Sequence, residues 1–206
     1  MPARGFLVLL LALWFTPAAL AQGPPQEFDC RAPGALPAAV RPFVAARTCA
    51  IALERGDLDR DGRPDFLLVL ERLDPAPNPD DGRLRSLLVL VAGEGGRLRE
   101  AARSDRVVAC TKCGGVWGDP FDGIEAGTGT FTVNHYGGSA WRWRADYTFG
   151  YSRRDRTWQL VRVSTLSYHT SNPDSMTKRV YTPPRHFGKI DLREFDPENY
   201  RGRGRR

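Results

Sequence analysis

The segment from Trp141 to Tyr151 constrains the fold more than any other part of the chain. Its odd positions are aromatic except for Ala145, and its even positions are charged, hydroxylated or glycine. Successive side chains of an extended strand point to opposite faces, so this alternation predicts a strand with one aromatic and one polar face. Alternating aromatic residues usually pack into a core. We therefore expect Trp141 and Trp143 to be buried.

Other segments indicate further strands around this one. They are rich in apolar and β-branched residues, are separated by turns containing Gly, Pro and Asp, and cover residues 49–54, 66–71, 86–92, 97–103, 131–136 and 158–163. Helical periodicity is nearly absent, and Pro42 limits a short helix within residues 37–49. The chain is predicted to be all-β and mainly antiparallel, as a single sandwich-like or propeller-like domain with little helix.

The first 21 residues have the three parts of a secretory signal. Arg4 supplies a positive end, residues 6–15 form an apolar run, and Ala19-Leu20-Ala21 is a small-x-small cleavage site. The run is about half as long as the roughly 20 apolar residues of a membrane-spanning helix, and Pro17 follows it. We therefore predict a periplasmic or secreted protein without a membrane span.

The rest of the chain divides by composition. We expect a flexible lead-in at residues 22–36, a single β-rich domain at 37–195 and a basic disordered tail at 196–206. Four of the last six residues are arginine, and without these and Arg4 the formal charge of +6 falls to about +1. A body of such low charge does not indicate a nucleic-acid-binding protein, and we expect a monomer.

Four cysteines remain after the predicted cleavage, and an even number in an oxidising compartment indicates disulfides. Three pairings are possible, of which we favour the local one, Cys30–Cys49 with Cys110–Cys113. The second pair is a C-x-x-C, which is elsewhere a redox motif. Here Gly114-Gly115 follow directly and no helix pattern begins, so we interpret the pair as structural.

The strongest chemical signal is the sequence GDLDRDGRPD at residues 56–65. Asp57, Asp59, Asp61 and Asp65 occupy positions 1, 3, 5 and 9 of a loop, with Gly62 at position 6, where the chain turns sharply. Calcium takes six to eight oxygen ligands, which alternate carboxylates on a tight loop can supply, and the carbonyl of Arg63 at position 7 can add another. The loop therefore predicts a Ca²⁺ site.

The loop differs from an EF-hand because position 12 is Leu68 and its flanks are strands. It resembles the D-x-D-x-D-G-x-x-D calcium loop of FG-GAP and VCBS-like repeats, which joins two β-strands. This resemblance implies that Asp65 replaces the missing glutamate. Because the loop joins two apolar strands, and the sequence shows neither an open coordination position nor a nearby acid or nucleophile, we expect the calcium to have a structural role.

A second block, residues 110–144, contains GGVWGDPFDGI followed by HYGGSAWRW. It resembles a group of uncharacterised bacterial secreted or periplasmic proteins that share this block and the Asp-rich loop. A looser similarity is to periplasmic immunity proteins and inhibitors of peptidoglycan hydrolases. The candidate binding residues in this block are Trp117, Asp119, Phe121, His135, Tyr136, Ser139 and Trp141. Trp and Tyr are common at binding hot spots.

Three functional hypotheses follow. The first is a non-enzymatic binding or inhibitory module of the cell envelope, with a protein partner such as a wall-degrading enzyme. The second is an envelope hydrolase that uses Asp119 or His135, although no pair of carboxylates and no G-x-S-x-G motif supports it. A zinc site formed by Cys110, Cys113, His135 and His169 would compete with the disulfide. The third is a structural glycan-binding protein. We favour a protein that is not an enzyme.

Overall fold

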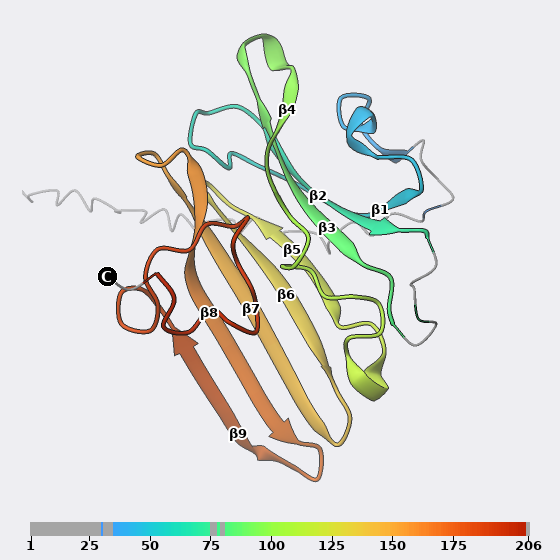
Figure 1. Cartoon of the computed structure of the whole chain (residues 1–206), viewed down its shortest axis with the longest axis vertical. Helices are drawn as coiled ribbons and strands as arrows, with labels where there is room; N and C mark the ends of the chain where they lie inside the picture. Colours follow the sequence, from blue (N-terminus) through green and yellow to red (C-terminus); the bar gives the residue numbers. More distant parts are fainter. Residues whose placement is uncertain (1–29, 31–34, 75–77, 79–80, 205–206) are drawn as a thin grey trace, which may run out of the picture.

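The computed structural model describes residues 30, 35–74, 78 and 81–204. They form two antiparallel sheets of four and five strands that pack face to face (Figure 1). Regular helix among the described residues consists of short 3-10 turns such as η2 (Arg41–Phe43) and η3 (Glu94–Gly96). The prediction of an all-β, mainly antiparallel fold is confirmed, in its sandwich-like form.

The four-stranded sheet, here sheet A, contains β1 (Thr48–Gly56), β2 (Asp65–Arg72), β3 (Arg85–Ala92) and β4 (Leu98–Ser104) in chain order. Both faces of this sheet are covered. Leu67, Val69, Leu87 and Val89 face the core between the sheets, whereas Leu68, Leu70, Leu88 and Leu90 pack against Leu36, Val40, Phe43 and Val44. This double burial explains why β2 and β3 are continuous apolar runs in the sequence.

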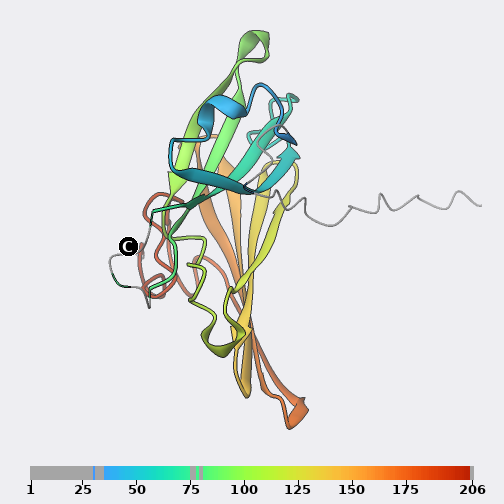
Figure 2. The same ribbon diagram turned by 90° about the vertical axis from the view of Figure 1, so that its right-hand side faces the viewer.

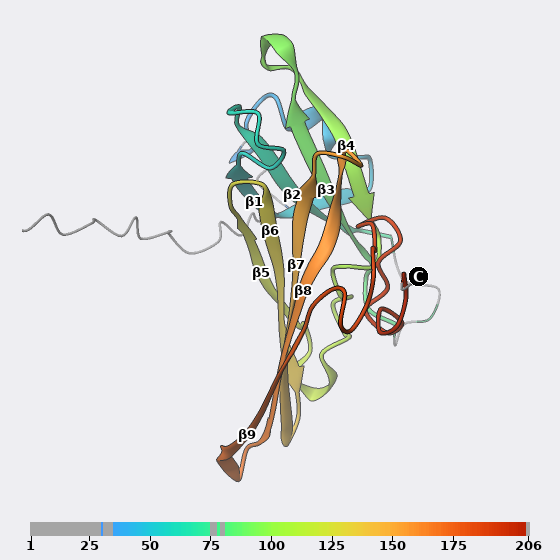
Figure 3. The ribbon, with the colours of Figure 1, turned by 90° about the vertical axis from the view of Figure 1, so that its left-hand side faces the viewer.

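The five-stranded sheet, here sheet B, contains β5 (Phe121–Ala126), β6 (Thr130–Gly138), β7 (Trp141–Ser152), β8 (Thr157–His169) and β9 (Asn172–Tyr181) in chain order. Its inner face packs Phe131, Phe149 and Trp158 into the common core. Sheet B is longer than sheet A, so its end near the β6–β7 and β8–β9 turns projects as a single layer (Figures 2 and 3). We call this end the distal half.

The segment after β9 lies against the inner face of sheet B (Figure 1). Phe187, Ile190, Leu192 and Phe195 are buried in the common core. Residues 196–204 form turns rather than the expected disordered tail. Tyr200 is 5 % exposed and contacts Phe187 and Phe195, and the Gly202 N–H donates to the His186 carbonyl at 2.9 Å. The buried Tyr200 ring and these backbone hydrogen bonds hold the basic segment on the domain.

Every strand expected from the sequence is present, and β5 and β9 were not expected. Trp141 is a correction, because its side chain is 64 % exposed instead of buried. It lies on the distal half, where no second sheet covers it. The predicted signal peptide (1–21) and most of the predicted lead-in (22–36) lie outside the described residues. Within the described part, no helix has the length and apolar character to cross a membrane.

Candidate functional site

The Asp-rich loop connects β1 to β2 and is anchored to both sheets. Leu58, at its second position, is fully buried in the common core. The Leu58 carbonyl accepts a hydrogen bond from the indole Nε1 of Trp158 at 2.9 Å, and the Asp57 carbonyl accepts one from the Gly129 N–H at 2.7 Å. Trp158 and Gly129 belong to β8 and to the β5–β6 turn. Any ligand that orders this loop therefore acts on both layers of the sandwich.

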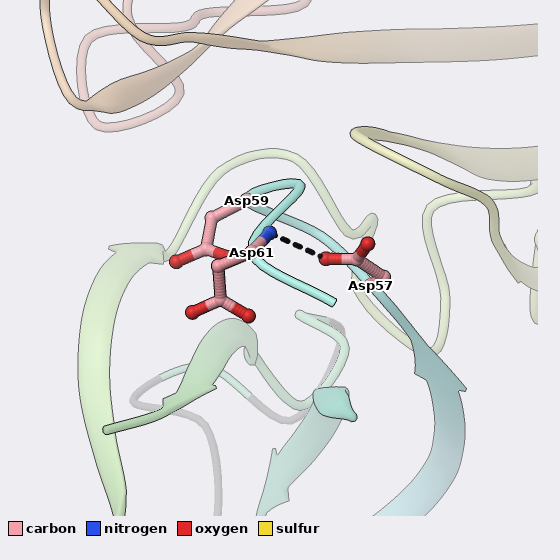
Figure 4. A group of neighbouring side chains, drawn as sticks. All are labelled: Asp57, Asp59 and Asp61. Atoms are coloured by element: carbon pink, nitrogen blue, oxygen red, sulfur yellow. Dashed lines mark hydrogen bonds between the residues drawn. The ribbon is translucent and has the colours of Figure 1, made fainter. Parts of the chain in front are cut away.

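Three of the four aspartates converge. Asp57, Asp59 and Asp61 each offer one carboxylate oxygen, and these oxygens lie within 4.8 Å of one another (Figure 4). Gly62 has φ +84°, as the sharp turn requires, and the Asp61 N–H donates to Oδ1 of Asp57 at 3.0 Å. Oδ1 of Asp59 is buried and has no hydrogen-bond partner among the described residues. The three carboxylates are arranged as oxygen ligands of a cation would be.

Asp65, the fourth aspartate of the loop, binds backbone N–H groups. It is fully buried and lies outside the group of three. Its Oδ2 accepts the Leu58 N–H at 2.8 Å, and its Oδ1 accepts the Ala92 N–H at 2.9 Å. The carboxylate thus ties both ends of the loop to β3. Each oxygen retains a second lone pair, so this role does not prevent it from binding a metal ion.

Arg63 also interacts with the acidic cluster. Its N–H donates to Oδ1 of Asp61 at 2.8 Å, its guanidinium forms an ion pair with the same carboxylate, and its Nε donates to the Ala92 carbonyl at 2.9 Å. The guanidinium neutralises part of the loop's charge. A cation at this site would have to compete with it for Asp61.

The electrostatics of the loop favour neutralisation by a positive charge. Burial raises the pKa of Asp59, and the charges of Asp65 and Asp61 raise it further. Burial also raises the pKa of Asp65, and the hydrogen bonds from Ala92 and Leu58 oppose this increase. Without a cation, these carboxylates therefore ionise less readily than in water. A bound divalent ion would reverse both effects.

His135 is a structural residue of the core between the sheets. It is 2 % exposed, and its Nε2 accepts the Ala109 N–H at 3.1 Å. Nδ1 has no hydrogen-bond partner among the described residues. The Ala145 backbone lies near the ring and acts to raise its pKa. Burial outweighs this and lowers the pKa to about 4, because the charged imidazolium loses its hydration. A neutral ring that contacts Phe121 and Tyr147 is poorly placed to act as a base.

Asp119 belongs to an ion-pair network with the buried residues Arg85 and Glu71, and its own side chain is 45 % exposed. Arg85, which is 4 % exposed, donates Nη1 to Oδ1 of Asp119 at 2.6 Å and Nη2 to Oε2 of Glu71 at 2.7 Å. The same Asp119 oxygen accepts the Phe121 N–H at 3.0 Å. Asp119 therefore holds the start of β5 against β3.

Ser139 lies in the turn between β6 and β7, where its N–H donates to the Trp141 carbonyl.

The remaining candidate binding residues lie on the distal half. On the outer face, the Trp117 ring meets Tyr136 edge-on at 5.2 Å, the guanidinium of Arg142 lies 4.3 Å from the Trp117 centroid, and Tyr136 is hydrogen-bonded to Tyr168. Trp117 is 52 % exposed. We call Trp117, Tyr136, Arg142 and Tyr168 the tip cluster. Trp141 points to the inner face and packs edge-on against His169.

Both expected disulfides are present, Cys30–Cys49 and Cys110–Cys113. The Cys110–Cys113 bond removes the two thiolates that a zinc site would need. The C-x-x-C is followed by the 3-10 turn η4 (Gly115–Trp117) and no longer helix, in agreement with a structural disulfide. Two disulfides are typical of proteins from oxidising compartments.

Comparison of this chain with protein-family models, with curated proteins and with solved structures found no match. The two family resemblances of the sequence therefore stay predictions.

Sequence reasoning missed Arg142, Tyr168 and Arg85. Alternation along β7 does place Arg142 on the polar face, but no sequence signal indicates that Trp117 stacks on it.

Proposed function

We propose that this chain is an exported calcium-binding β domain that acts as a non-enzymatic binding or inhibitory module of the cell envelope. The observation that carries the proposal is the tip cluster. Trp, Tyr and Arg are the residue types that dominate binding energy at protein interfaces. Here they are partly exposed and held together by ring contacts and a hydrogen bond, with Tyr136, Arg142 and Tyr168 on strands and Trp117 on the 3-10 turn η4. A preorganised surface of this kind loses little entropy on binding.

The proposed partner is a protein such as a cell-wall lytic enzyme. Inhibition of a lysozyme-type muramidase by the native protein provides the readout. Trp117→Ala should weaken inhibition about tenfold or more, because truncating a hot-spot tryptophan typically costs at least about 2 kcal/mol. Val180→Ala, at another exposed position of sheet B, should leave it unchanged. Absence of inhibition, with no protein retained from a periplasmic extract, would contradict this part of the proposal.

Calcium is proposed to stabilise the domain through the Asp-rich loop. The convergence of Asp57, Asp59 and Asp61, with one buried Asp59 oxygen lacking a partner, supports this role. A ligand at about 100 times its Kd adds about 2.7 kcal/mol to the free energy of unfolding. For a domain of this size, that corresponds to roughly 5–10 °C in Tm.

Thermal unfolding in millimolar calcium and in EGTA tests the site. The native protein and the control Asp174→Asn, which changes an exposed β9 carboxylate, should both show the calcium-dependent increase in Tm. The double variant Asp59→Asn/Asp61→Asn should lose it while remaining folded in EGTA. Identical Tm values for the native protein in calcium and EGTA would refute the calcium proposal.

Two alternative functions can be tested separately. An envelope hydrolase that uses Asp119 or His135 would lose turnover in folded Asp119→Asn or His135→Ala variants. The structural bonds of both residues argue against it. A structural glycan-binding role is favoured by the exposed aromatic side chains Trp117 and Trp141. Glycan-array binding without any protein partner would support that role.

A further inference from the structure

A groove of about 330 Å³ lies on the inner face of sheet B, between the distal half and the C-terminal segment. Three strands and one C-terminal side chain line it: β7, β8, β9 and Arg201. Its volume is at the lower end of the range of small-ligand pockets. It lies on the opposite face of sheet B from the tip cluster, and neither the Asp-rich loop nor that cluster lines it.

Strand register determines the floor of this groove. In one cross-strand row Trp143 pairs with Ser167, and Ser167 with Thr177. In the next row Ala145 pairs with Thr165, and Thr165 with Arg179. The small Ala145 leaves a hollow between the larger side chains. Arg144 and Leu166 alternate with these positions, so they contribute backbone only and their side chains leave on the outer face.

Trp143 forms one side of the groove because β6 has a glycine beside it. A Cβ on Gly137 would lie 2.7 Å from the indole of Trp143, so the ring rests directly against the bare backbone of β6. The side chain is half-buried and held in place by this contact. This contact explains the first glycine of the YGGSAW sequence, Gly137, because a side chain there would displace the Trp143 ring.

The groove is positively charged, and several of its polar side chains have no hydrogen-bond partner among the described residues, whereas Arg201 is held by Tyr200 and Tyr181. No acidic residue lines it. Arg179 is exposed and makes no hydrogen bond or ion pair with any described residue, and the guanidinium of Arg201 is held 4.6 Å from the Tyr181 ring centroid. The hydroxyls of Thr165, Ser167 and Thr177 likewise have no hydrogen-bond partner in the part of the chain that the structure describes. Two guanidiniums, three hydroxyls and an indole thus converge on one hollow.

We propose that this groove binds an acidic glycan, with the carboxylate between Arg179 and Arg201 and a sugar ring against Trp143. Guanidinium groups match carboxylates in geometry and form charge-assisted hydrogen bonds with them. The free hydroxyls of the floor are suited to the hydroxyl groups of a sugar, and the indole offers an apolar surface to its C–H groups. This inference goes beyond the proposed function and holds even if the tip cluster has no partner.

The calcium-loaded protein tests the proposal in titrations followed by calorimetry and tryptophan fluorescence. The probe is the disaccharide of N-acetylglucosamine and N-acetylmuramic acid, which carries one carboxylate. Its neutral counterpart is N,N′-diacetylchitobiose, and sodium sulfate represents a simple anion. The acidic disaccharide should bind about tenfold or more tightly than the neutral one, since loss of a charge-assisted pair has this effect.

Matched variants locate the site. Arg179→Gln and Arg201→Gln should each weaken binding of the acidic disaccharide about tenfold. Arg162→Gln removes the same charge from β8 on the outer face and should have no effect, and Trp117→Ala should also bind normally. Equal affinity for the acidic and neutral disaccharides, sulfate binding as tight as that of the acidic disaccharide, or normal binding by folded Arg179→Gln would overturn the proposal.

Discussion

His135 makes the stability of the domain depend on pH in a direction that the structure defines. Its pKa is lowered to about 4 in the folded protein, from the ordinary value of 6.5, because burial disfavours the imidazolium. Between these two pH values the unfolded chain binds more protons than the folded chain. The free energy of unfolding should therefore fall as the pH is lowered through this window.

The magnitude follows from the two pKa values. A shift of one pKa unit corresponds to 1.36 kcal/mol, and the full shift of His135 to about 3 kcal/mol. Between pH 7 and about pH 4.5, this single residue should remove roughly 2.5 kcal/mol of stability. The buried carboxyl of Asp65, whose pKa is raised, contributes with the opposite sign, so the effect of His135 must be isolated by comparing variants.

Urea unfolding at a series of pH values, at one calcium concentration, measures the effect. His135→Gln can still accept the Ala109 N–H and lacks the titrating ring, so its stability should depend less on pH than that of the native protein. His169→Gln, which changes a histidine near the β8–β9 turn, should retain the native pH dependence. Equal pH dependence of the native protein and His135→Gln would refute the reasoning. It would mean that folding does not lower the pKa of His135.

Two further substitutions test the contacts that hold the layers together. Trp158→Phe removes the hydrogen bond to the buried Leu58 carbonyl and leaves a smaller ring. Urea unfolding should therefore show that the free energy of unfolding falls by about 2–4 kcal/mol. Tyr151→Phe, which changes the ring beside Trp158, should cost little. Arg85→Met removes the buried partner of the Glu71 carboxylate and should cost about 3 kcal/mol, the low end for breaking a buried ion pair, because the half-exposed Arg83 still binds Glu71. The double variant Arg85→Met/Glu71→Gln should recover part of this loss in the same assay, and no recovery would show that the charge of Glu71 is not responsible.

Much of the fold follows from local patterns. The apolar runs of β2 and β3 and the alternation of β7 identify strands because side-chain spacing along a strand does not depend on distant residues. By contrast, β9 was not expected. Its residues are exposed from Asn172 to Val180, as an edge strand of a single layer, so burial imposes no pattern on them.

The sequence predicted the surroundings of some candidate site residues correctly and of others wrongly, for a similar reason. Alternation along β7 indicates which residues share a face, but it does not indicate whether a second layer covers that face. Trp141 was therefore expected in the core, and it is exposed because sheet B extends beyond sheet A. His135 lies on the same face of the sheet and is buried, because the backbone at Ala109 and the ring of Phe121 cover it.

The sequence by itself determined the features that depend on neighbours along the chain: strands, the tight Asp-rich loop and the two local disulfides. Only the tertiary structure decided that Asp65 accepts the backbone N–H of Ala92, and that Arg179 and Arg201 line one groove. The physical reason is that these contacts join residues far apart in the chain. Which of them form depends on sheet length, strand register and the path of the C-terminal segment.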